Sequence, residues 1–326
     1  MTDKIVIAIA GSGDIAKYAV DELLNHGGIR VIVLSRDKKE WFDKRSPDVT
    51  VHTTDYSVSS ILNILNSTAA VALFSLIHSF DEAVYKGTHR AMLEACQASN
   101  TCKRYSPSYY GGNIDAFPGY PRVYKDVHQA YHDELVKTAG GIEWTVVNIA
   151  LIMDYIINFK DDEEYEDKSY IRSIRSILPI DLKEWSAVIP GTGNEPAGFT
   201  SARDVGKAIA ALATTTEKWD QHTYIYGEQI TWNVLLKKLE KHNGRKFNEG
   251  ENLKYISLKE IQQQLDAPAE DESATLGVMM NLEWTALGAQ GLPVDIVEGQ
   301  RAKFFGGVHF RTVDEFLEDS KTMTVV

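Results

Sequence analysis

The sequence predicts an α/β protein: a Rossmann-type, doubly wound parallel sheet with a smaller C-terminal substrate lobe. Short runs of β-branched and apolar residues alternate with helix-spaced segments from the first residues onward. A glycine-rich turn, Gly11–Ala16, lies between the first of these strands and the first helix. After Ala150 the alternation gives way to chain rich in proline and glycine, which is typical of a different architecture.

The alternating elements can be assigned in order. Strands are predicted over residues 4–10, 30–34, 49–53, 69–75, 103–106 and 143–148. Helices are predicted over residues 14–26, 57–66, 81–99 and 123–138. Right-handed crossovers bring the carboxyl ends of parallel strands to one edge of the sheet, where ligands bind. We therefore expect residues 1–157 to form a dinucleotide-binding domain with its site on that edge.

The second half, residues 158–326, is expected to form the substrate-binding lobe. It begins with an acidic stretch, residues 160–168, interpreted as a solvated loop. Further helices are predicted over residues 202–216, 232–243, 257–265, 273–288 and 312–320, with a strand over 223–226. Some elements around residues 200–232 are expected to return to the first domain.

Composition excludes several classes of protein. The formal net charge is −12, a field that repels nucleic acid. The apolar run Ala69–Ile77 is too short to span a bilayer, and the N-terminal run has no signal-peptide features. The two cysteines, Cys96 and Cys102, indicate reduced packing thiols rather than a disulfide framework. We expect a cytoplasmic protein with a small-molecule substrate and neither membrane nor nucleic acid as partner.

The Gly11–Ala16 turn has the form GxGxxA and predicts a phosphate loop. The first glycine permits the tight turn, Gly13 lets the backbone approach a pyrophosphate, and Ala16 allows close helix–strand packing. The helix N-terminus adds unpaired N–H groups and a positive dipole end. A glycine-rich turn without a ligand is the alternative. The residues expected to hold the pyrophosphate are Gly11, Ser12, Gly13, Asp14 and Ile15.

The end of the second strand predicts NADP(H) rather than NAD(H). An acid that binds the ribose hydroxyls is common there, but this chain has Arg36, whose guanidinium suits a 2′-phosphate. Lys38 and Lys39 add positive charge, although Arg36 could also be a solvated turn residue. Asp55, after the third strand, could face the adenine or cap the helix that starts at Ser57.

Further blocks along the chain resemble the NmrA-like and isoflavone-reductase-like branch of the atypical short-chain dehydrogenases, fungal members in particular. Tyr105–Gly111 is similar to a Phe-x-Pro-Ser-Glu-[Phe/Tyr]-Gly segment of that family, and Glu143–Thr145 to its Trp/Tyr-Thr strand. The order of the blocks supports the resemblance. The later ones are Asp154-Tyr155, Ile189–Gly193, Phe199-Thr200, Arg203–Gly206 and Thr312–Leu317. The resemblance implies a Rossmann domain, a small C-terminal lobe and NADP(H) along the strand edge.

Two departures from the family pattern concern the active centre. Tyr109 stands where the family has its acid. The family's functional lysine falls at His128, Gln129 or Ala130, depending on an insertion near Gly140, and none of these is lysine. Lys125 lies about one helical turn earlier and could replace it.

The nicotinamide is expected against the ends of the fourth and fifth strands. The cofactor-binding residues predicted there are Ser75, Leu76, Ile77, Pro107 and Ser108. Hydride transfer requires orientation and a group near the accepting atom that can donate or accept a proton. The predicted catalytic residues are Tyr109, Lys125 and His128, with aromatic packing or a solvated lysine as the alternatives. His128 and His132 lack a convincing third ligand, so no metal site is predicted.

Three functions remain open. The first is an NADP(H)-dependent reductase that acts on a carbonyl, imine or conjugated double bond of a medium-sized, apolar secondary metabolite. The second is an NADPH-dependent cyclase or isomerase, which the resemblance implies through reduction-coupled Diels–Alder cyclisation in prenylated indole alkaloid pathways. The third, which the resemblance implies through the regulatory branch of the family, is a non-catalytic redox sensor, the only case that requires a protein partner.

Overall fold

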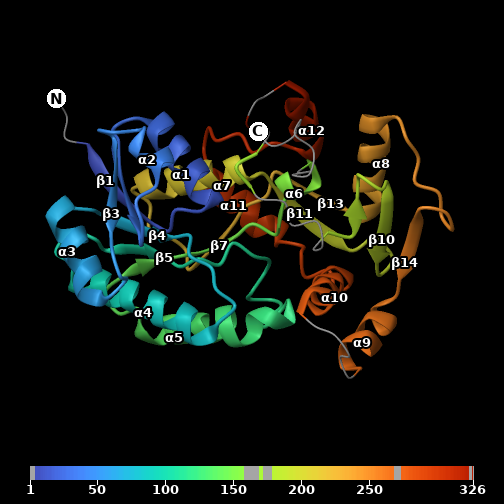
Figure 1. Cartoon of the computed structure of the whole chain (residues 1–326), viewed down its shortest axis with the longest axis horizontal. Helices are drawn as coiled ribbons and strands as arrows, with labels where there is room; N and C mark the ends of the chain where they lie inside the picture. Colours follow the sequence, from blue (N-terminus) through green and yellow to red (C-terminus); the bar gives the residue numbers. More distant parts are fainter. Residues whose placement is uncertain (1–3, 158–168, 172–177, 268–272, 323–324, 326) are drawn as a thin grey trace.

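A computed structural model of the chain describes residues 4–157, 169–171, 178–267, 273–322 and 325, so the predicted acidic loop at 160–168 lies outside the described residues. A six-stranded parallel sheet in the order β3-β2-β1-β4-β5-β6 forms its centre (Figure 1). All six strands are parallel, but they are added first on one side of β1 and then, from β4 onward, on its other side. This change of side between β1 and β4 is the one expected of the predicted doubly wound fold. The strands are β1 (Ile5–Ala10), β2 (Ile29–Ser35), β3 (Val49–Thr53), β4 (Ala72–Ser75), β5 (Arg104–Ser106) and β6 (Glu143–Trp144).

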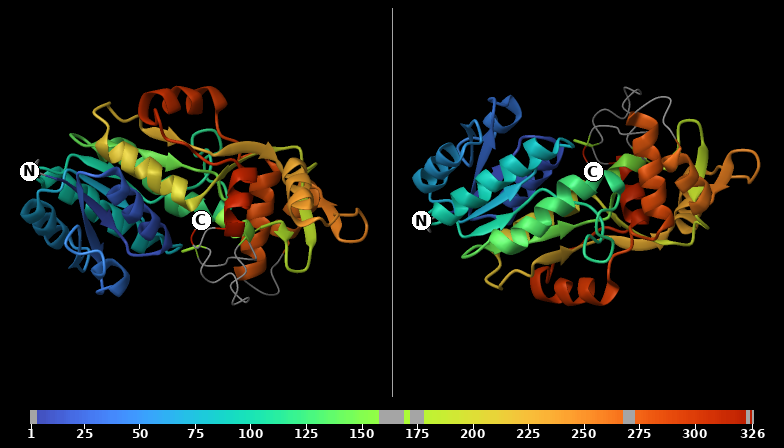
Figure 2. Two further views of the ribbon diagram at one scale, coloured as in Figure 1. Left: turned by 90° about the horizontal axis from the view of Figure 1, so that it is seen from above. Right: turned by 90° about the horizontal axis from the view of Figure 1, so that it is seen from below.

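Helices cover both faces of this sheet, because its strands are apolar on both sides. On β1, Val6 and Ala8 pack into one core and Ile7 and Ile9 into the other. The first face is covered by α3 (Val58–Thr68), α4 (Glu82–Ala98) and α5 (Ala130–Thr138). The second face is covered by α1 (Asp14–His26), the short α2 (Glu40–Asp43), α7 (Ala202–Thr214) and α11 (Val294–Phe304) (Figure 2).

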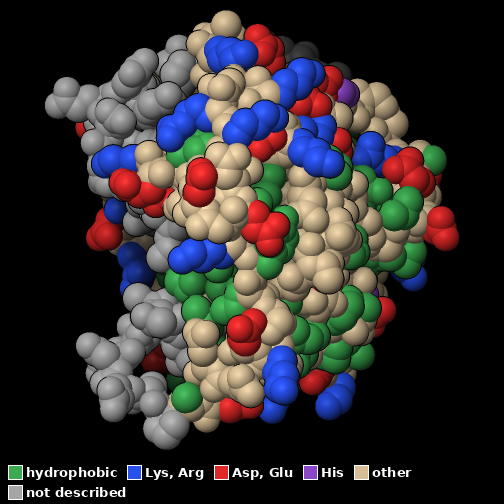
Figure 3. Space-filling view, turned by 90° about the vertical axis from the view of Figure 1, so that its right-hand side faces the viewer, with side chains coloured by type: hydrophobic (Ala, Val, Ile, Leu, Met, Phe, Trp, Pro, Cys, Tyr) green, Lys and Arg blue, Asp and Glu red, His purple; other side chains and the backbone are tan. Residues whose placement is uncertain are grey.

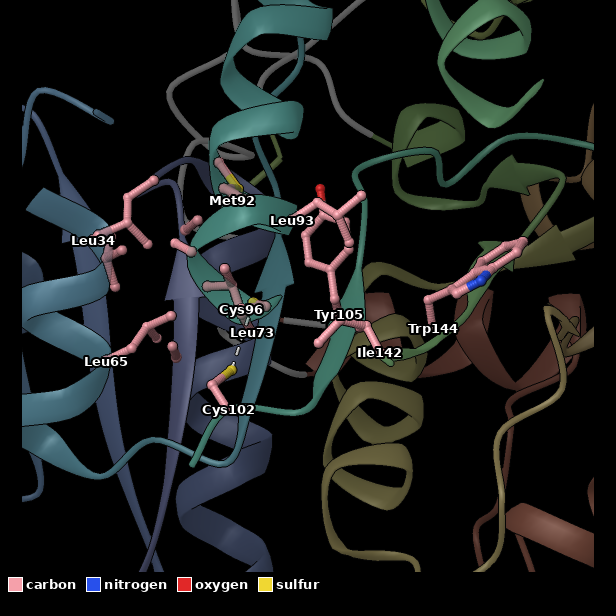
Figure 4. Packing of buried hydrophobic residues seen from close by; sticks show 14 of the residues in the cluster. Leu34, Leu65, Leu73, Met92, Leu93, Cys96, Cys102, Tyr105, Ile142 and Trp144 are labelled. Carbon is pink, nitrogen blue, oxygen red and sulfur yellow. Dashed lines mark hydrogen bonds between the residues drawn. The ribbon is translucent and has the colours of Figure 1, made fainter. Parts of the chain in front are cut away.

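The first core contains both cysteines. Leu73 and Tyr105 from the strands meet Met92 from α4, and none of the three is exposed (Figure 4). Cys96 and Cys102 are free thiols in the same core, with their Sγ atoms 3.7 Å apart. Both side chains therefore fill space beside the sheet.

The second half of the chain contributes to the layer around this sheet. Helix α7 packs along α1 so closely that a Cβ at Gly206 would lie 2.7 Å from the carbonyl oxygen of Tyr18. Strand β12 (His222–Tyr224) pairs in parallel with β7 (Val146–Asn148). At Gly206, only a residue without a side chain permits α7 to approach α1 this closely.

Two predicted elements are interrupted. The strand predicted over 143–148 breaks at Thr145: β6 pairs with β5, whereas β7 leaves the sheet to pair with β12. The Thr145 and Thr223 hydroxyls are 2.8 Å apart at this junction. The helix predicted over 123–138 begins irregularly, with a 3-10 turn at Arg122–Tyr124 and a π-helical turn at Lys125–Gln129 before α5. Such π turns are common at functional sites.

The C-terminal lobe has two small sheets around its own core. Strand β10 (Ser186–Pro190) lies between β14 (Leu253–Ile256) and β9 (Ile180–Asp181), and β11 (Pro196–Thr200) lies between β13 (Glu228–Thr231) and β8 (Leu151–Ile152). The helices around them are α6 (Asp154–Ile157), α8 (Trp232–Asn243), α9 (Leu258–Asp266), α10 (Ser273–Ala286) and α12 (Val313–Thr322).

The core of this lobe is built from large side chains such as Phe199, Trp232 and Phe316. On the face that the lobe presents in Figure 3, acidic and basic side chains are mixed with scattered hydrophobic ones. None of the described helices is both long and apolar enough to cross a membrane.

Candidate functional site

A groove of about 930 Å³ runs along the carboxyl ends of β1, β2 and β4, where the order of the strands reverses. Its walls come from the phosphate loop, the residues that follow β2, β3 and β4, the first turns of α4, and two segments from later in the chain. The lining residues are Gly11–Ala16, Ser35–Asp37, Lys39, Asp55, Tyr56, Leu76–Ser79, Val84, Thr88, Tyr155 and Ile171.

The predicted phosphate loop forms one end of this groove. Gly11 has φ +104°, and a Cβ there would lie 3.2 Å from the backbone of Leu76. Gly13 is the N-terminal cap of α1, with no side-chain cap, and a Cβ on it would meet nothing within 4 Å. Gly13 therefore leaves open space in front of a helix N-terminus, which suits a phosphate group.

The end of β2 supplies positive charge beside this loop. Arg36 is exposed on the groove wall together with Lys39, whereas Lys38 does not line the groove. Asp37 lines the groove as well, and its N–H donates to the Ser35 hydroxyl over 3.4 Å. The strand end thus offers a guanidinium for a phosphate and a carboxylate for hydroxyl groups.

Asp55 lies on the groove but does not cap the following helix. Ser57 caps α3, because its side chain accepts the Ser60 N–H. The Asp55 carboxylate instead accepts the N–H and the hydroxyl of Ser57, at 2.9 and 2.7 Å. Tyr56 beside it has φ +60° and donates its hydroxyl to the Leu34 carbonyl over 2.6 Å. Burial raises the pKa of Tyr56 to about 12, so its hydroxyl stays neutral on the groove wall.

The residues predicted at the nicotinamide end divide into two layers. Leu76 and Ile77 line the groove, but Ser75, Pro107 and Ser108 are buried outside its lining. The Ser75 hydroxyl is 3.0 Å from His89 Nε2, and the Ser108 N–H donates to the same nitrogen over 3.3 Å. Ser75 and Ser108 therefore hold the buried His89 ring behind the wall instead of lining the groove.

Hydrogen bonds in this buried layer assign the protonation of two histidines. His89 Nδ1 lies 2.8 Å from the Tyr85 carbonyl, so this nitrogen carries the proton and Nε2 accepts. The Tyr85 hydroxyl donates to the Ser108 carbonyl over 2.5 Å and must therefore accept from His128 Nδ1, at 3.0 Å. His128 Nε2 consequently carries a lone pair, and this buried nitrogen has no partner among the described residues.

His128 lies one ring behind the groove wall. Its imidazole stacks on that of His78, which lines the groove, with the centroids 5.2 Å apart and the planes 9° apart. Tyr124 and Tyr109 enclose it at 4.2 and 5.5 Å. Burial, and to a lesser extent His78 and His89, hold the pKa of His128 well below its usual value. The ring is therefore neutral near pH 7.

The three predicted catalytic residues have different surroundings. Tyr109 is buried beside His128, its hydroxyl has no partner among the described residues, and burial raises its pKa well above 10. Lys125 is exposed, and its stem lies near Gly119. The structure thus brings Tyr109 and His128 together and leaves Lys125 at the surface.

The second histidine of the predicted helix is directed elsewhere. His132 Nε2 lies 3.3 Å from His222 Nε2 on β12. In the part of the chain that the structure describes, no three His, Cys, Asp or Glu side chains meet closely enough to hold a metal ion.

Sequence reasoning missed several residues on the groove. Ser79, Val84 and Thr88 follow β4, so extending the predicted strand end into the next helix would have found them. Tyr155 lies in the Asp154-Tyr155 block, which carried no functional prediction. Ile171 joins the wall from more than 150 residues beyond the loop, and no local pattern indicates such a contact.

Comparisons with known proteins agree with this architecture. No protein-family model matches the chain. The chain is 32% identical over 312 residues to "Oxidoreductase swnR" from Arthroderma benhamiae, covering 95% of this chain and 96% of the relative. It is similar in structure to the leucoanthocyanidin reductase–NADPH complex from Vitis vinifera, with a TM-score of 0.71 and 17% identity over 98% of this chain and 100% of the other. An isoflavone reductase gives a TM-score of 0.73 and 15% identity over 97% and 99% of the two chains.

Proposed function

Because the chain belongs to the NmrA-like and isoflavone-reductase-like family of atypical short-chain dehydrogenases, we propose that it is an NADP(H)-dependent oxidoreductase. Its substrate would be a medium-sized, mostly apolar secondary metabolite, reduced at a carbonyl, imine or conjugated double bond. The oxidoreductase name and fungal source of the relative support this class of activity.

One observation carries the proposal: open space at Gly13 and the cationic end of β2 lie on the same groove. The N-terminus of α1 would hold the pyrophosphate through the backbone N–H groups of its first turn. Arg36 would pair with the 2′-phosphate, and the Asp37 carboxylate, which lines the same groove, would accept from ribose hydroxyls. The bound cofactor supplies the hydride, and the protein supplies orientation and electrostatics.

Tyr109 and His128 do not line the groove, so we propose that they act on a substrate whose binding displaces the His78 ring that covers them. A neutral tyrosine hydroxyl without a protein partner can donate a hydrogen bond to an oxygen or nitrogen that gains negative charge. His128 Nε2 can accept one from a substrate hydroxyl or N–H. Because the Tyr85 hydroxyl, which donates to the Ser108 carbonyl, fixes the ring and the tautomer of His128, its Nε2 acceptor is preorganised.

The walls near this pair suit an apolar, ring-containing substrate. The aromatic rings of His78, Tyr109 and Tyr124 pack around His128. Phe80, which is 62% exposed, packs edge-on against His78. Aromatic walls with a few placed polar groups are typical of small-molecule sites.

The test is product analysis with a panel of ketones, imines and enones, incubated with NADPH or with NADP⁺. We expect NADPH consumption matched mole for mole by reduced product, and no reduction with NADP⁺. Tight NADPH binding without turnover of any substrate would instead favour the redox-sensor function.

A cyclase that couples reduction to ring closure is the second candidate, and one observation favours it. The buried position next to Tyr109 holds a neutral histidine, and the lysine near it is exposed, so a proton relay through lysine is not built into the site. Template chemistry depends on shape and fixed polar groups. New ring systems among the products of the same assay would identify this activity.

A further inference from the structure

A three-residue segment from the second half of the chain is fastened to the first helix. Tyr170 packs its ring against Tyr18 of α1, with centroids 4.8 Å apart, and edge-on against Trp41 of α2 at 5.3 Å. The ammonium of Lys17 lies 5.3 Å from the same ring. The segment Ser169–Ile171 thus lies on two helices of the nucleotide-binding half.

Hydrogen bonds join Ser169 and Tyr170 to surrounding residues, and a further bond within the segment links Ile171 to Ser169. The Tyr170 N–H donates to the Tyr18 hydroxyl over 3.0 Å, and the Tyr170 hydroxyl donates to Asp21 over 3.1 Å. The Ser169 hydroxyl donates to Asp154 over 2.8 Å and accepts the Ile171 N–H over 3.0 Å.

Asp154 is the anchor of this arrangement. Its side chain is fully buried, and its second carboxylate oxygen accepts the N–H of Ala202, the first residue of α7, over 2.8 Å. One carboxylate therefore joins the segment to α7, while the Tyr18 hydroxyl, 3.3 Å away, joins both to α1. Buried carboxylates are expensive unless they are hydrogen-bonded in this way.

The fastened segment reaches the dinucleotide groove. Ile171 is 3% exposed and lines the groove together with Tyr155, Asp14 and Ile15. Tyr18, Ile171 and Ala202 form a small core against which Ile15 and Tyr155 pack. The segment therefore builds an apolar wall beside the first turn of α1, where the pyrophosphate is proposed to sit.

We propose that Ser169–Ile171 is a clasp that retains the bound dinucleotide, with Tyr18 and Asp154 as its positioning residues. The proposal rests on the NADP(H) site proposed above. A wall that stabilises the complex after encounter acts mainly on dissociation, because association is limited by diffusion and orientation. The clasp should therefore lengthen the residence time of the cofactor and leave its association rate nearly unchanged.

The test is stopped-flow measurement of NADPH association and of its dissociation in a chase with excess NADP⁺. Tyr170→Ala removes the ring contacts, Tyr170→Phe removes only the bond to Asp21, and Ile171→Ala removes the apolar wall. We expect dissociation about tenfold faster for Tyr170→Ala and Ile171→Ala, about threefold faster for Tyr170→Phe, and association within about twofold for all three.

Tyr255→Phe is the matched control, because it removes one hydroxyl hydrogen bond, to Asn233 over 2.8 Å, in the other lobe. It should dissociate NADPH like the wild type. Thermal unfolding and near-UV circular dichroism would verify that each variant is folded. Wild-type dissociation rates in folded Tyr170→Ala and Ile171→Ala proteins would overturn the clasp alone. A wild type that does not bind NADPH would overturn the proposed cofactor, and the clasp with it.

Discussion

The Nδ1 atom of His128 lies 3.0 Å from the hydroxyl of Tyr85, and this contact determines which nitrogen of the imidazole carries its proton. The Tyr85 hydroxyl donates its own hydrogen to the Ser108 carbonyl, so His128 must donate to Tyr85. Every chemical role of this histidine then depends on the lone pair at Nε2. The buried ring can accept a hydrogen bond or a proton, but it is not a source of protons near pH 7.

Gly13→Val should abolish dinucleotide binding and leave the fold intact. The side chain would enter open space in front of α1, so it would meet the ligand and not the protein. Gly87→Val is the control, because Gly87 lies on the exposed side of α4 and a Cβ there also meets nothing within 4 Å. Fluorescence titration with NADPH tests this. Wild-type affinity in folded Gly13→Val protein would exclude the phosphate-loop assignment.

Arg36→Ala should weaken NADPH much more than NADH. The loss of a charge-assisted contact to the 2′-phosphate should cost about 1.5–3 kcal/mol, or roughly ten- to hundredfold in affinity. Lys38→Ala removes an exposed charge two residues away that does not line the groove, and should have little effect. The measurement is the dissociation constant of NADPH and of NADH for the wild type, Arg36→Ala and Lys38→Ala. Equal losses for NADPH and NADH would show that Arg36 does not read the phosphate.

Tyr109→Phe should lower single-turnover rates about 10²–10⁴-fold with little change in NADPH affinity. The hydroxyl has no protein partner among the described residues, so its removal breaks no internal hydrogen bond and should leave the melting temperature unchanged. The control is Tyr110→Phe, because Tyr110 packs with the core on the other face of the sheet.

Variants of His128 and Lys125, measured in the same single-turnover assay, test whether these two residues take part in the reaction. His128→Gln should reduce the rate to a similar extent as Tyr109→Phe. The exposed Lys125→Ala should reduce it least. A cyclising enzyme would reveal itself by altered product ratios at nearly constant rate. Wild-type rates and products in Tyr109→Phe and His128→Gln together would place the chemistry elsewhere.

Stability should fall as the pH is lowered from about 7 to 5. Burial lowers the pKa of His89 and of His222 to about 4, and lowers that of His128 as well. Between about pH 6.5 and 4 the unfolded chain therefore binds protons that the folded chain does not. Each such histidine removes about 1.4 kcal/mol of unfolding free energy per pH unit in this range.

Urea unfolding at pH 7, 6 and 5 measures this slope. His222→Gln should reduce the slope by about the share of one histidine. A stability that is constant over this range would contradict the neutral, buried state of these rings.

The nucleotide-binding half was largely predictable because its signals are local. Alternating apolar runs locate the strands of the central sheet, and Gly11 is required by its positive φ and by its close approach to the backbone of Leu76. Arg36 is predictable for the same reason, since it follows a strand whose end must lie on the ligand edge.

Residues whose position depends on packing between distant elements were not predictable. Ser75 looks like a wall residue by spacing, but its hydroxyl turns to His89. The predicted strand ending at Asn148 breaks at Thr145 because its second half, Val146–Asn148, pairs with the distant strand β12 instead of β5. The tautomer of His128 depends on Tyr85, which lies 43 residues away, and the periodicity of the sequence does not indicate this contact.

The close approach of α7 to α1 has a consequence for how this chain can be divided and recombined. A fragment that ends at Ile157 would keep all six strands of the central sheet but lose α7, whose Val205, Ala208, Ile209 and Leu212 cover one face of it. That face would be left as an aggregation-prone apolar surface. The boundary suggested by the sequence is therefore a poor site for a chimaera, and exchange of substrate lobes between relatives would need a crossover that keeps 202–214 with the donor of α1.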